Sequence, residues 1–495
     1  MERQQHATTG RRKCKMSPKN IRLRRPASLL PSALLAHRSS SSGLQGVLTP
    51  RPMTAAFTRA VLVILLKIYR ANCHDAVQEV SALRRPSLET GQQRKLPRKV
   101  LIGYASSNYT NVLNAVMEDG VNVVIWAFMD VRSTGVHASP SSATEIRDLS
   151  RMQSQGDAGA NTLVRKLIQL RAQSSQSYME STNATITTNL DFNAIASVIQ
   201  QLNAFGYSRV LHLVSVGGWN SPHLDESLSP TEWFAVWKSS VLSQLFQGID
   251  WDFEGNDVLD SKENVFTVQC LNKMGEISRL LKEDKTNFSH HALTSKEGYI
   301  VTTAPPQSYL NTRTQNFSRY VNLTSPTRTW HPKFHYFGSN VYAYFLARFG
   351  ENVDLVSIQF YESYSDAAMA VFHDKMSPGD YIFDFMQELA SQHFQFYVDF
   401  SQDTLLDEMT GQYVSLPLDK IVIGLANGWA LEKRNRNKVL YISPEQCKNA
   451  YDKLKVSSDG DLTPRGFMFW TIEERGKNGV YLAKGLSHFL LESAS

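Results

Sequence analysis

The 495-residue sequence predicts an α/β fold in which eight parallel strands, each followed by a helix, close into a (β/α)8 TIM barrel. Three observations support this prediction. Short runs of apolar and β-branched residues recur eight times from Lys99 onward, amphipathic stretches lie between them, and this alternation is typical of parallel strands covered by helices. An open, doubly wound sheet is the alternative, but no Gly-x-Gly-x-x-Gly motif follows an expected strand.

The expected strands are short and rich in β-branched or apolar residues, as buried parallel strands are. We expect them at 100–104, 121–128, 210–216, 248–254, 299–303, 355–361, 421–426 and 466–470.

The clearest expected helix spans 191–205, where apolar residues recur at helical spacing between a capping residue, Asp191, and Gly206. Four further stretches place apolar residues along one side in the same way. They lie at 231–246, 266–281, 381–389 and 479–491.

Two expected loops are longer than a barrel requires. Residues 131–190, after the second strand, are polar and Ser-rich and hold one expected helix at 161–173, whereas residues 305–353, after the fifth strand, are rich in aromatic side chains. Both loops follow the carboxyl ends of strands, where barrel enzymes build their sites. The aromatic rings could stack on sugars, but for most of them we favour a small core within the loop itself.

Residues 1–98 form an N-terminal extension whose composition differs from that of residues 99–495, which we assign to the barrel. The first 52 residues hold eleven Lys or Arg and a single acid, and outside the signal peptide discussed next we expect the extension to be disordered. The formal charge of +6 on the whole chain therefore arises in the extension. The rest of the chain is mildly acidic and shows no basic stripe for nucleic acid.

A short apolar run at 60–66 follows Arg59, and small residues stand after it at Ala71 and Cys73, which resembles the core of a secretory signal peptide. We interpret residues 53–73 as this signal peptide, with Met53 as the start of translation, and expect the protein to be extracellular. A buried helix or an organelle-targeting peptide is the alternative, because the first fifty residues are rich in Arg and Ser. The run is too short for a stable membrane span, which needs about 20 apolar residues.

The chain has four cysteines, at Cys14, Cys73, Cys270 and Cys447, and no Cys-x-x-Cys pair. This spacing indicates neither a structural zinc site nor a disulfide-built scaffold. Cys270 and Cys447 could pair, and the sequence leaves this open.

The most informative stretch is Gln247-Gly248-Ile249-Asp250-Trp251-Asp252-Phe253-Glu254. Because alternate side chains of a strand share a face, the three acids should line one face and the apolar residues between them the other. Acids that lie so close raise each other's pKa, and one of them would stay protonated near neutral pH, as a general acid must. An exposed strand edge explains the same spacing, so the acids alone leave catalysis undecided.

Four motifs together carry a resemblance to a known family. The strand at 248–254, with Gln247 before it, resembles the Asp-Gly-x-Asp-x-Asp-x-Glu signature of glycoside hydrolase family 18, the chitinases. Ser215-Val216-Gly217-Gly218 is similar to its Ser-x-Gly-Gly motif, Gln359-Phe360-Tyr361 to its Gln-x-Tyr element, and Trp470 to the tryptophan that floors its sugar site. The motifs occur in the family's order, each at the end of an expected strand, across residues 98–495. We read Ser215, Gly217 and Gly218 as structural.

The resemblance implies hydrolysis of β-1,4-linked N-acetylglucosamine polymers with retention, in which the substrate's own acetamido group is the nucleophile. It implies that Glu254 is the general acid and base, that Asp252 holds the acetamido N–H, and that Asp250 lies behind Asp252 and shares a proton with it. Tyr361 would align the acetamido oxygen. The resemblance further assigns substrate binding to Gln359, Trp470 and Tyr104, and it implies no metal or organic cofactor.

The sequence departs from the family pattern at two positions. Gln247 replaces the first acid of the motif, which we expect to lie deepest in the barrel and to orient Asp250, and Gln cannot carry a charge. Glu362 stands where compact members carry Asn or Asp. The segment 427–465 is too short for the extra α+β domain of many chitinases, which favours the compact class III-like type.

Two other functions fit the same residues. A carbohydrate-binding protein could keep the barrel and lose turnover, although relatives of that kind lack the terminal glutamate, which is present here as Glu254. An endo-β-N-acetylglucosaminidase acting on N-glycans is the third candidate. In each case we expect a monomer whose partners are chitin or N-acetylglucosamine oligosaccharides rather than nucleic acid.

Overall fold

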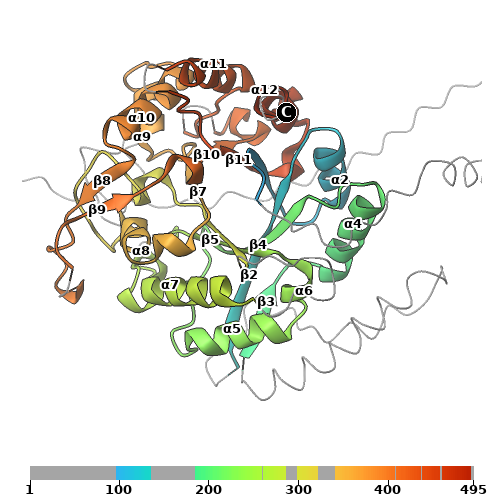
Figure 1. Cartoon of the computed structure of the whole chain (residues 1–495), viewed down its shortest axis with the longest axis vertical. Coiled ribbons are helices and arrows are strands. Elements are labelled where there is room, and N and C mark those ends of the chain that lie inside the picture. Colours follow the sequence, from blue (N-terminus) through green and yellow to red (C-terminus); the bar gives the residue numbers. More distant parts are fainter. Residues whose placement is uncertain are drawn as a thin grey trace, which may run out of the picture. The chain divides into compact units, whose positions relative to one another are not determined.

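The computed structural model of the chain describes residues 96–134, 184–258, 260–285, 298–321, 340–406, 409–435, 438–457 and 460–491, all within the unit Leu88–Ser495 (Figure 1). The expected signal peptide, the helix at 161–173, Cys14 and Cys73 lie outside the described residues.

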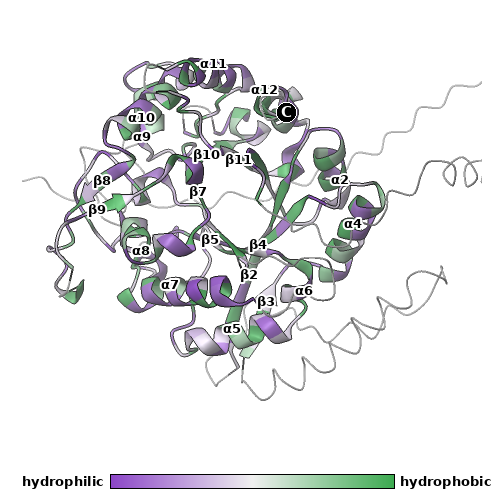
Figure 2. Ribbon diagram, viewed as in Figure 1, coloured by the Kyte–Doolittle hydropathy of each residue, from purple (hydrophilic) through white to green (hydrophobic). Residues whose placement is uncertain are grey.

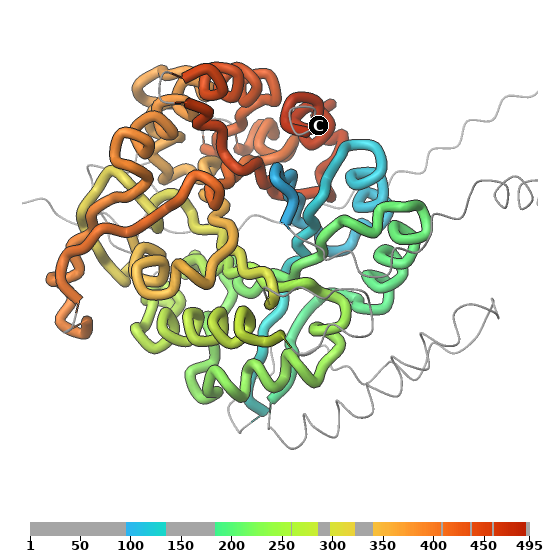
Figure 3. Tube along the Cα trace, viewed as in Figure 1, coloured from blue at the N-terminus to red at the C-terminus, as the bar shows by residue number. Residues whose placement is uncertain are grey.

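Eight parallel strands close into a barrel, which confirms the predicted fold class. Each strand pairs with its neighbours, and the circle is closed by the pairing of the first strand with both the second and the last. In order around the barrel the strands are β1 (Val100–Ala105), β2 (Val123–Ser133), β4 (Leu211–Gly218), β5 (Gly248–Phe253), β6 (Ile300–Thr303), β7 (Leu355–Gln359), β10 (Ile421–Ala426) and β11 (Gly466–Trp470). Each coincides with an expected strand to within a few residues, and the colours of Figure 3 run once around the circle.

Successive side chains of the barrel strands point alternately outward and inward, and so contribute to two separate hydrophobic cores. Ile249, Trp251 and Phe253 of β5 point outward into the large core beneath the helices, and all three are fully buried. A second, smaller core fills the barrel and includes Ile102, Leu213 and other side chains from several strands. Figure 2 shows the corresponding hydrophobic strands inside a ring of helices with mixed faces. Residues of β5 that point inward therefore face the interior and the mouth of the barrel.

Most expected helices are present, although their first and last residues differ from the expected ones by a few positions. Helix α4 (Phe192–Ala204) begins after Asp191, whose side chain accepts hydrogen bonds from Asn193 N and Ala194 N, as predicted. The single helix expected at 231–246 is two, α5 (Pro230–Ser239) and α6 (Leu242–Leu245), because Ser240 has an extended backbone. The remaining helices are α2 (Tyr109–Met117), α7 (Val268–Glu283), α8 (Val341–Phe349), α9 (Asp366–Phe372), α10 (Pro378–Ser391), α11 (Pro444–Lys455) and α12 (Leu482–Leu490).

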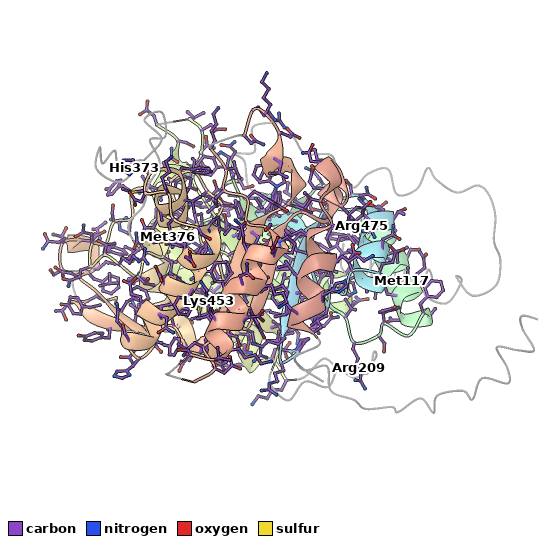
Figure 4. The ribbon with its side chains drawn as sticks, turned by 90° about the horizontal axis from the view of Figure 1, so that it is seen from above. Met117, Arg209, His373, Met376, Lys453 and Arg475 are labelled. Atoms are coloured by element: carbon purple, nitrogen blue, oxygen red, sulfur yellow. The ribbon has the colours of Figure 1, made fainter. Side chains whose placement is uncertain are left out.

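Ion pairs fasten helices to the barrel. Arg475 donates to Asp119 and Glu118, at 2.6 Å each, just beyond the end of α2 that carries Met117 (Figure 4). Asp119 is 1% exposed, so this contact holds α2 against the segment that follows β11.

Three strands lie outside the predicted set. β2 continues beyond the barrel rim, and its residues Met129–Ser133 pair antiparallel with β3 (Ala184–Thr188). The strands β8 (Gln395–Val398) and β9 (Gln412–Ser415) form a separate two-stranded sheet between α10 and β10. In the described part of residues 427–465 there is a helix, α11, and no named strand, while the compact class III-like type itself stays a prediction.

The structure also describes two of the four cysteines and allows a search for membrane-spanning helices and metal sites. Cys270 and Cys447 are each buried and free rather than paired with one another. Within the described ranges no helix is long and apolar enough to cross a bilayer, and no group of His, Cys, Asp and Glu side chains is arranged to hold a metal ion.

Candidate active site

The three acids of the expected motif lie together at the carboxyl end of β5, on its inward face. Asp250, Asp252 and Glu254 are 0%, 3% and 7% exposed. The pairing of β4 with β5 sets Ser215 opposite Asp250 and Gly217 opposite Asp252. The arrangement excludes the exposed strand edge that the sequence left open, because none of the three carboxyls is at the surface.

Asp250 is held by hydroxyl groups from three other strands. Tyr104 Oη and Ser215 Oγ both donate to Asp250 Oδ2, at 2.6 and 2.9 Å, and Thr302 Oγ1 donates to Asp250 Oδ1 at 2.6 Å. Burial raises the pKa of Asp250, and these three hydrogen bonds oppose the rise. Ser215, read from the sequence as structural, thus also bonds Asp250 directly, as does Tyr104, which is only 1% exposed.

Asp252 lies one step nearer the barrel mouth, and the side-chain amide of Gln359 bonds one of its two carboxyl oxygens. Gln359 Nε2 donates to Asp252 Oδ1 at 2.9 Å and to the carbonyl of Ala304 at 2.6 Å. Burial raises the pKa of Asp252 well above its usual range, and the nearby carboxyls of Glu254 and Asp250 raise it further. Gln359, 1% exposed, thus orients this carboxyl.

Glu254 is a buried carboxyl whose surroundings favour its protonated form. Burial raises its pKa well above the usual range, the neighbouring Glu362 adds to the rise, and hydrogen bonds to Gln359 and Asp252 oppose it. Carboxyls of this kind stay protonated where an ordinary glutamate would be ionised.

Glu362 is a fourth carboxyl at this site, next in the chain to Tyr361. Burial raises the pKa of Glu362 to about 7, and its charge contributes to the raised pKa of both Glu254 and Asp252. The sequence marked Glu362 as a departure from the family pattern but assigned it no role. In its ionised form Glu362 acts electrostatically on Glu254 and Asp252.

Tyr361 and Trp470 form an aromatic border beside the acids. Tyr361 is 6% exposed and packs in a small cluster with Trp429 and Trp470. The Trp470 ring is half-buried, 5.4 Å from the ring of Tyr104 and nearly parallel to Phe128, with 5.5 Å between centroids. Burial raises the pKa of Tyr361 well above its usual range, and the charges of Glu362 and Glu254 add to the rise, so its hydroxyl stays a donor.

Gln247 does not occupy the position expected from its place in the motif. It precedes β5 at the opposite end from Glu254, and its Oε1 accepts a hydrogen bond from His212 N at 2.6 Å. By strand alternation it also lies on the face opposite to Asp250. Gln247 therefore joins β5 to β4, and the groups that orient Asp250 are the three hydroxyls described above. The expectation that this position lies deepest in the barrel and orients Asp250 was wrong.

The two glycines of the Ser-x-Gly-Gly motif have the structural role that was predicted. Gly217 has φ +119°, and a Cβ there would lie 2.5 Å from the carbonyl oxygen of Asp252. Gly218 has φ +93°, and a Cβ there would lie 2.7 Å from the ring of Phe128. Both glycines let the end of β4 approach the acids of β5 and the aromatic border.

Several residues of the site were not found from the sequence. Thr302 belongs to an expected strand, but nothing in its local pattern indicates that it faces Asp250 across the β5–β6 pairing. In the aromatic loop after β6, Tyr309, Tyr342 and Tyr344 are at most 1% exposed and belong to the large core beneath the helices rather than to a small core of the loop itself. Tyr320 of the same loop is 46% exposed. The other aromatics of that loop between 322 and 339 lie outside the described residues.

Comparison with known proteins finds solved structures of similar fold whose sequences are only 11–15% identical to this chain. No family model and no curated protein matches the sequence significantly. The catalytic domain of a family GH18 chitinase from the fern Peteris ryukyuensis is 15% identical, with 79% of this chain and 99% of that chain covered and a TM-score of 0.41. A mutant class V chitinase from Nicotiana tobaccum in complex with NAG4 is 12% identical, with 79% and 98% covered and a TM-score of 0.37. A xylanase-A-amylase inhibitor protein, XAIP-III, is 11% identical, with 78% and 97% covered and a TM-score of 0.38. At these values the matches do not distinguish an enzyme from an inhibitor, so the function is argued from the residues of this chain.

Proposed function

We propose that the protein is a chitinase-like member of glycoside hydrolase family 18 that cleaves β-1,4-linked N-acetylglucosamine polymers with retention of configuration. The observation that carries the proposal is the buried series Asp250, Asp252 and Glu254 on one inward strand face, with Gln359 bonded to Asp252. The order of the four sequence motifs supports the same reading.

In the proposed reaction Glu254 gives its proton to the glycosidic oxygen while the bond from that oxygen to the anomeric carbon breaks. The carbonyl oxygen of the substrate's 2-acetamido group attacks the same carbon and forms an oxazolinium ion. Water then attacks this carbon, the bond from the carbon to the acetamido oxygen breaks and restores the acetamide, and the Glu254 carboxylate takes the proton from the water. The raised pKa of Glu254 supports the first step, because the donor must still hold its proton near neutral pH.

The remaining residues orient and stabilise the reacting sugar in this proposal. Asp252 accepts a hydrogen bond from the acetamido N–H and stabilises the positive charge that develops, and the hydroxyl of Tyr361 donates to the acetamido oxygen. Asp250 holds Asp252 in place from behind. Trp470 offers an apolar face beneath the sugar ring.

Turnover of a fluorogenic chitotriose glycoside tests the proposal, with the Glu254→Gln variant beside the wild type. We expect the variant to lose on the order of 10²–10⁴ in rate, the usual share of a general acid, and to keep its oligosaccharide affinity. A well-folded wild type that binds the glycoside without turnover would instead indicate a binding protein. Product analysis on chitin oligomers and on glycoproteins separates a chitinase from an endo-β-N-acetylglucosaminidase.

We also propose that the protein is secreted, on the basis of the signal-like segment 53–73. N-terminal sequencing of the mature protein checks this. A mature chain that still contains the segment would contradict it.

A further inference from the structure

We propose that His223 is a positioning residue for the reaction: by donating a hydrogen bond to the backbone carbonyl of Glu254, it fixes the place from which the general acid acts. The inference rests on the proposed function, because it concerns how Glu254 delivers its proton. His223 Nε2 lies 3.1 Å from Glu254 O, and the residue follows β4 in a loop at the same end of the barrel.

The backbone that carries Glu254 needs donors from outside the sheet. β5 ends at Phe253, so the carbonyls that follow cannot all be satisfied by neighbouring strands. Three carbonyls in a row are instead bonded from α8 and from the loop after β4: Phe253 O by Tyr342 Oη at 2.9 Å, Glu254 O by His223 Nε2, and Gly255 O by Asn220 N at 3.0 Å. Of these, the His223 bond acts on the proton donor's own peptide group.

The state of the His223 ring suits this role. Burial lowers the pKa of His223 to about 4, so the ring is neutral at ordinary working pH. A neutral imidazole carries one N–H, and because the carbonyl can only accept, that hydrogen must lie on Nε2. The ring packs 4.3 Å from Phe266 and 5.5 Å from Phe253, which fixes its direction.

The loop that carries His223 is itself held from two sides. Arg132, on the part of β2 that extends beyond the barrel, donates from Nη2 to His223 O at 2.7 Å, and Ser133 N donates to Asp225 Oδ2 at 2.8 Å. From α7, Lys273 Nζ donates to Asp225 O at 2.6 Å. The β2 extension pairs with β3, so this strand, absent from the sequence prediction, supports the loop that positions Glu254.

A general acid works only within hydrogen-bond reach of the leaving oxygen, about 2.6–3.2 Å. Displacement of a reacting group by about 1 Å can cost roughly 100-fold in rate. An ordinary histidine that merely satisfies a carbonyl would stabilise the fold and affect every substrate alike. A positioning residue affects most strongly the substrate whose leaving group requires the proton.

The experiment compares His223→Phe, which removes the donor and keeps a ring, with His223→Gln, whose amide nitrogen reaches the place of Nε2. Each is assayed for kcat/KM, which reports the bond-breaking step, on a chitin tetramer and on a chitobioside with a dinitrophenyl leaving group that departs without protonation. The exposed His373, labelled in Figure 4, provides the control His373→Phe.

We expect His223→Phe to lose on the order of 10- to 100-fold on the tetramer and less than about threefold on the dinitrophenyl glycoside. His223→Gln should recover most of the tetramer activity, and His373→Phe should match the wild type on both substrates.

Equal losses on the two substrates, or a folded His223→Gln that recovers nothing, overturn the positioning role while the proposed function stands. If His223→Phe does not fold, His223→Asn takes its place, since its shorter amide cannot reach the carbonyl; activity equal to that of His223→Gln then overturns the role. A wild type inactive on both substrates overturns the proposed function and this inference together.

Discussion

The carboxyls of Asp250, in β5, and of Glu254, directly after it, are both buried, yet their surroundings differ. Asp250 accepts hydrogen bonds from hydroxyls of Tyr104, Ser215 and Thr302, and these bonds favour its ionised form. Glu254 instead has the acid Glu362 nearby, which favours its protonated form. The two environments therefore favour different protonation states of the two carboxyls, as the proposed role of Glu254 as general acid requires.

The charge of Glu362 gives a prediction for the pH dependence of activity. In Glu362→Gln this charge is absent, so Glu254 should lose its proton at a lower pH. The basic limb of the kcat/KM profile reports the general acid of the free enzyme, and we expect it to move to lower pH by about half a unit to one unit. The control is Asp380→Asn, which removes an exposed carboxylate paired with Lys453 on the helical surface. An unchanged basic limb in Glu362→Gln would contradict the assigned influence.

The same variant has a predicted effect on stability. Because the pKa of Glu362 rises from 4.5 to about 7 in the folded protein, the folded state holds this proton more tightly than the unfolded state. The corresponding stability is present below pH 4.5 and is lost as the pH rises through 7. We therefore expect the unfolding free energy of Glu362→Gln, relative to that of the wild type, to be about 1 to 3 kcal/mol higher at pH 8 than at pH 4. Urea unfolding at the two pH values measures this difference. A difference that is the same at both pH values would contradict the raised pKa.

At the scale of elements, the close approach of β4 to β5 depends on Gly217. Gly217 and Gly206 both have positive φ, +119° and +89°, but a Cβ would meet the backbone of Asp252 only at Gly217, since nothing lies within 4 Å at Gly206. Gly206→Ala should cost about 1 to 2 kcal/mol from its backbone alone. Gly217→Ala should cost a further 1 to 3 kcal/mol, roughly, from overpacking, and should lower activity by displacing Asp252. Equal unfolding free energies for the two variants would contradict this packing.

The elements that the sequence predicted are those whose pattern is local. Each barrel strand is a short apolar run, and α4 shows both its cap at Asp191 and its helical spacing. β3, β8 and β9 were missed because each mixes buried with more exposed residues instead of forming a continuous apolar run, and each is defined by its antiparallel partner strand. The break between α5 and α6 was missed because the apolar spacing continues across Ser240.

The candidate site was predictable to the extent that it lies within motifs. The alternating acids placed Asp250, Asp252 and Glu254 on one face, and the structure agrees. Thr302 and His223 could not be found in this way, because their contacts with β5 arise only when distant segments meet. Gln247 was misplaced because its position in the motif was carried over without regard to strand alternation.

At the scale of the whole molecule, closure of the barrel brings the site together. The groups that contact the acids come from β1, β4, β6 and β7, and the aromatic border adds β2 and β11. No single segment contains the site, so its geometry depends on the strand order and register of the complete barrel. The hydrogen bonds to Asp250 and Asp252 lie toward the carboxyl ends of the strands, where a substrate would reach Glu254.

The most direct test of the account is hydrolysis of two matched trimers, one of N-acetylglucosamine and one whose reacting sugar carries a free amine in place of the acetamido group. Because the proposed nucleophile is the acetamido oxygen, we predict that the protein cleaves the first and leaves the second intact. Cleavage of both trimers at similar rates, or of neither, would contradict the account.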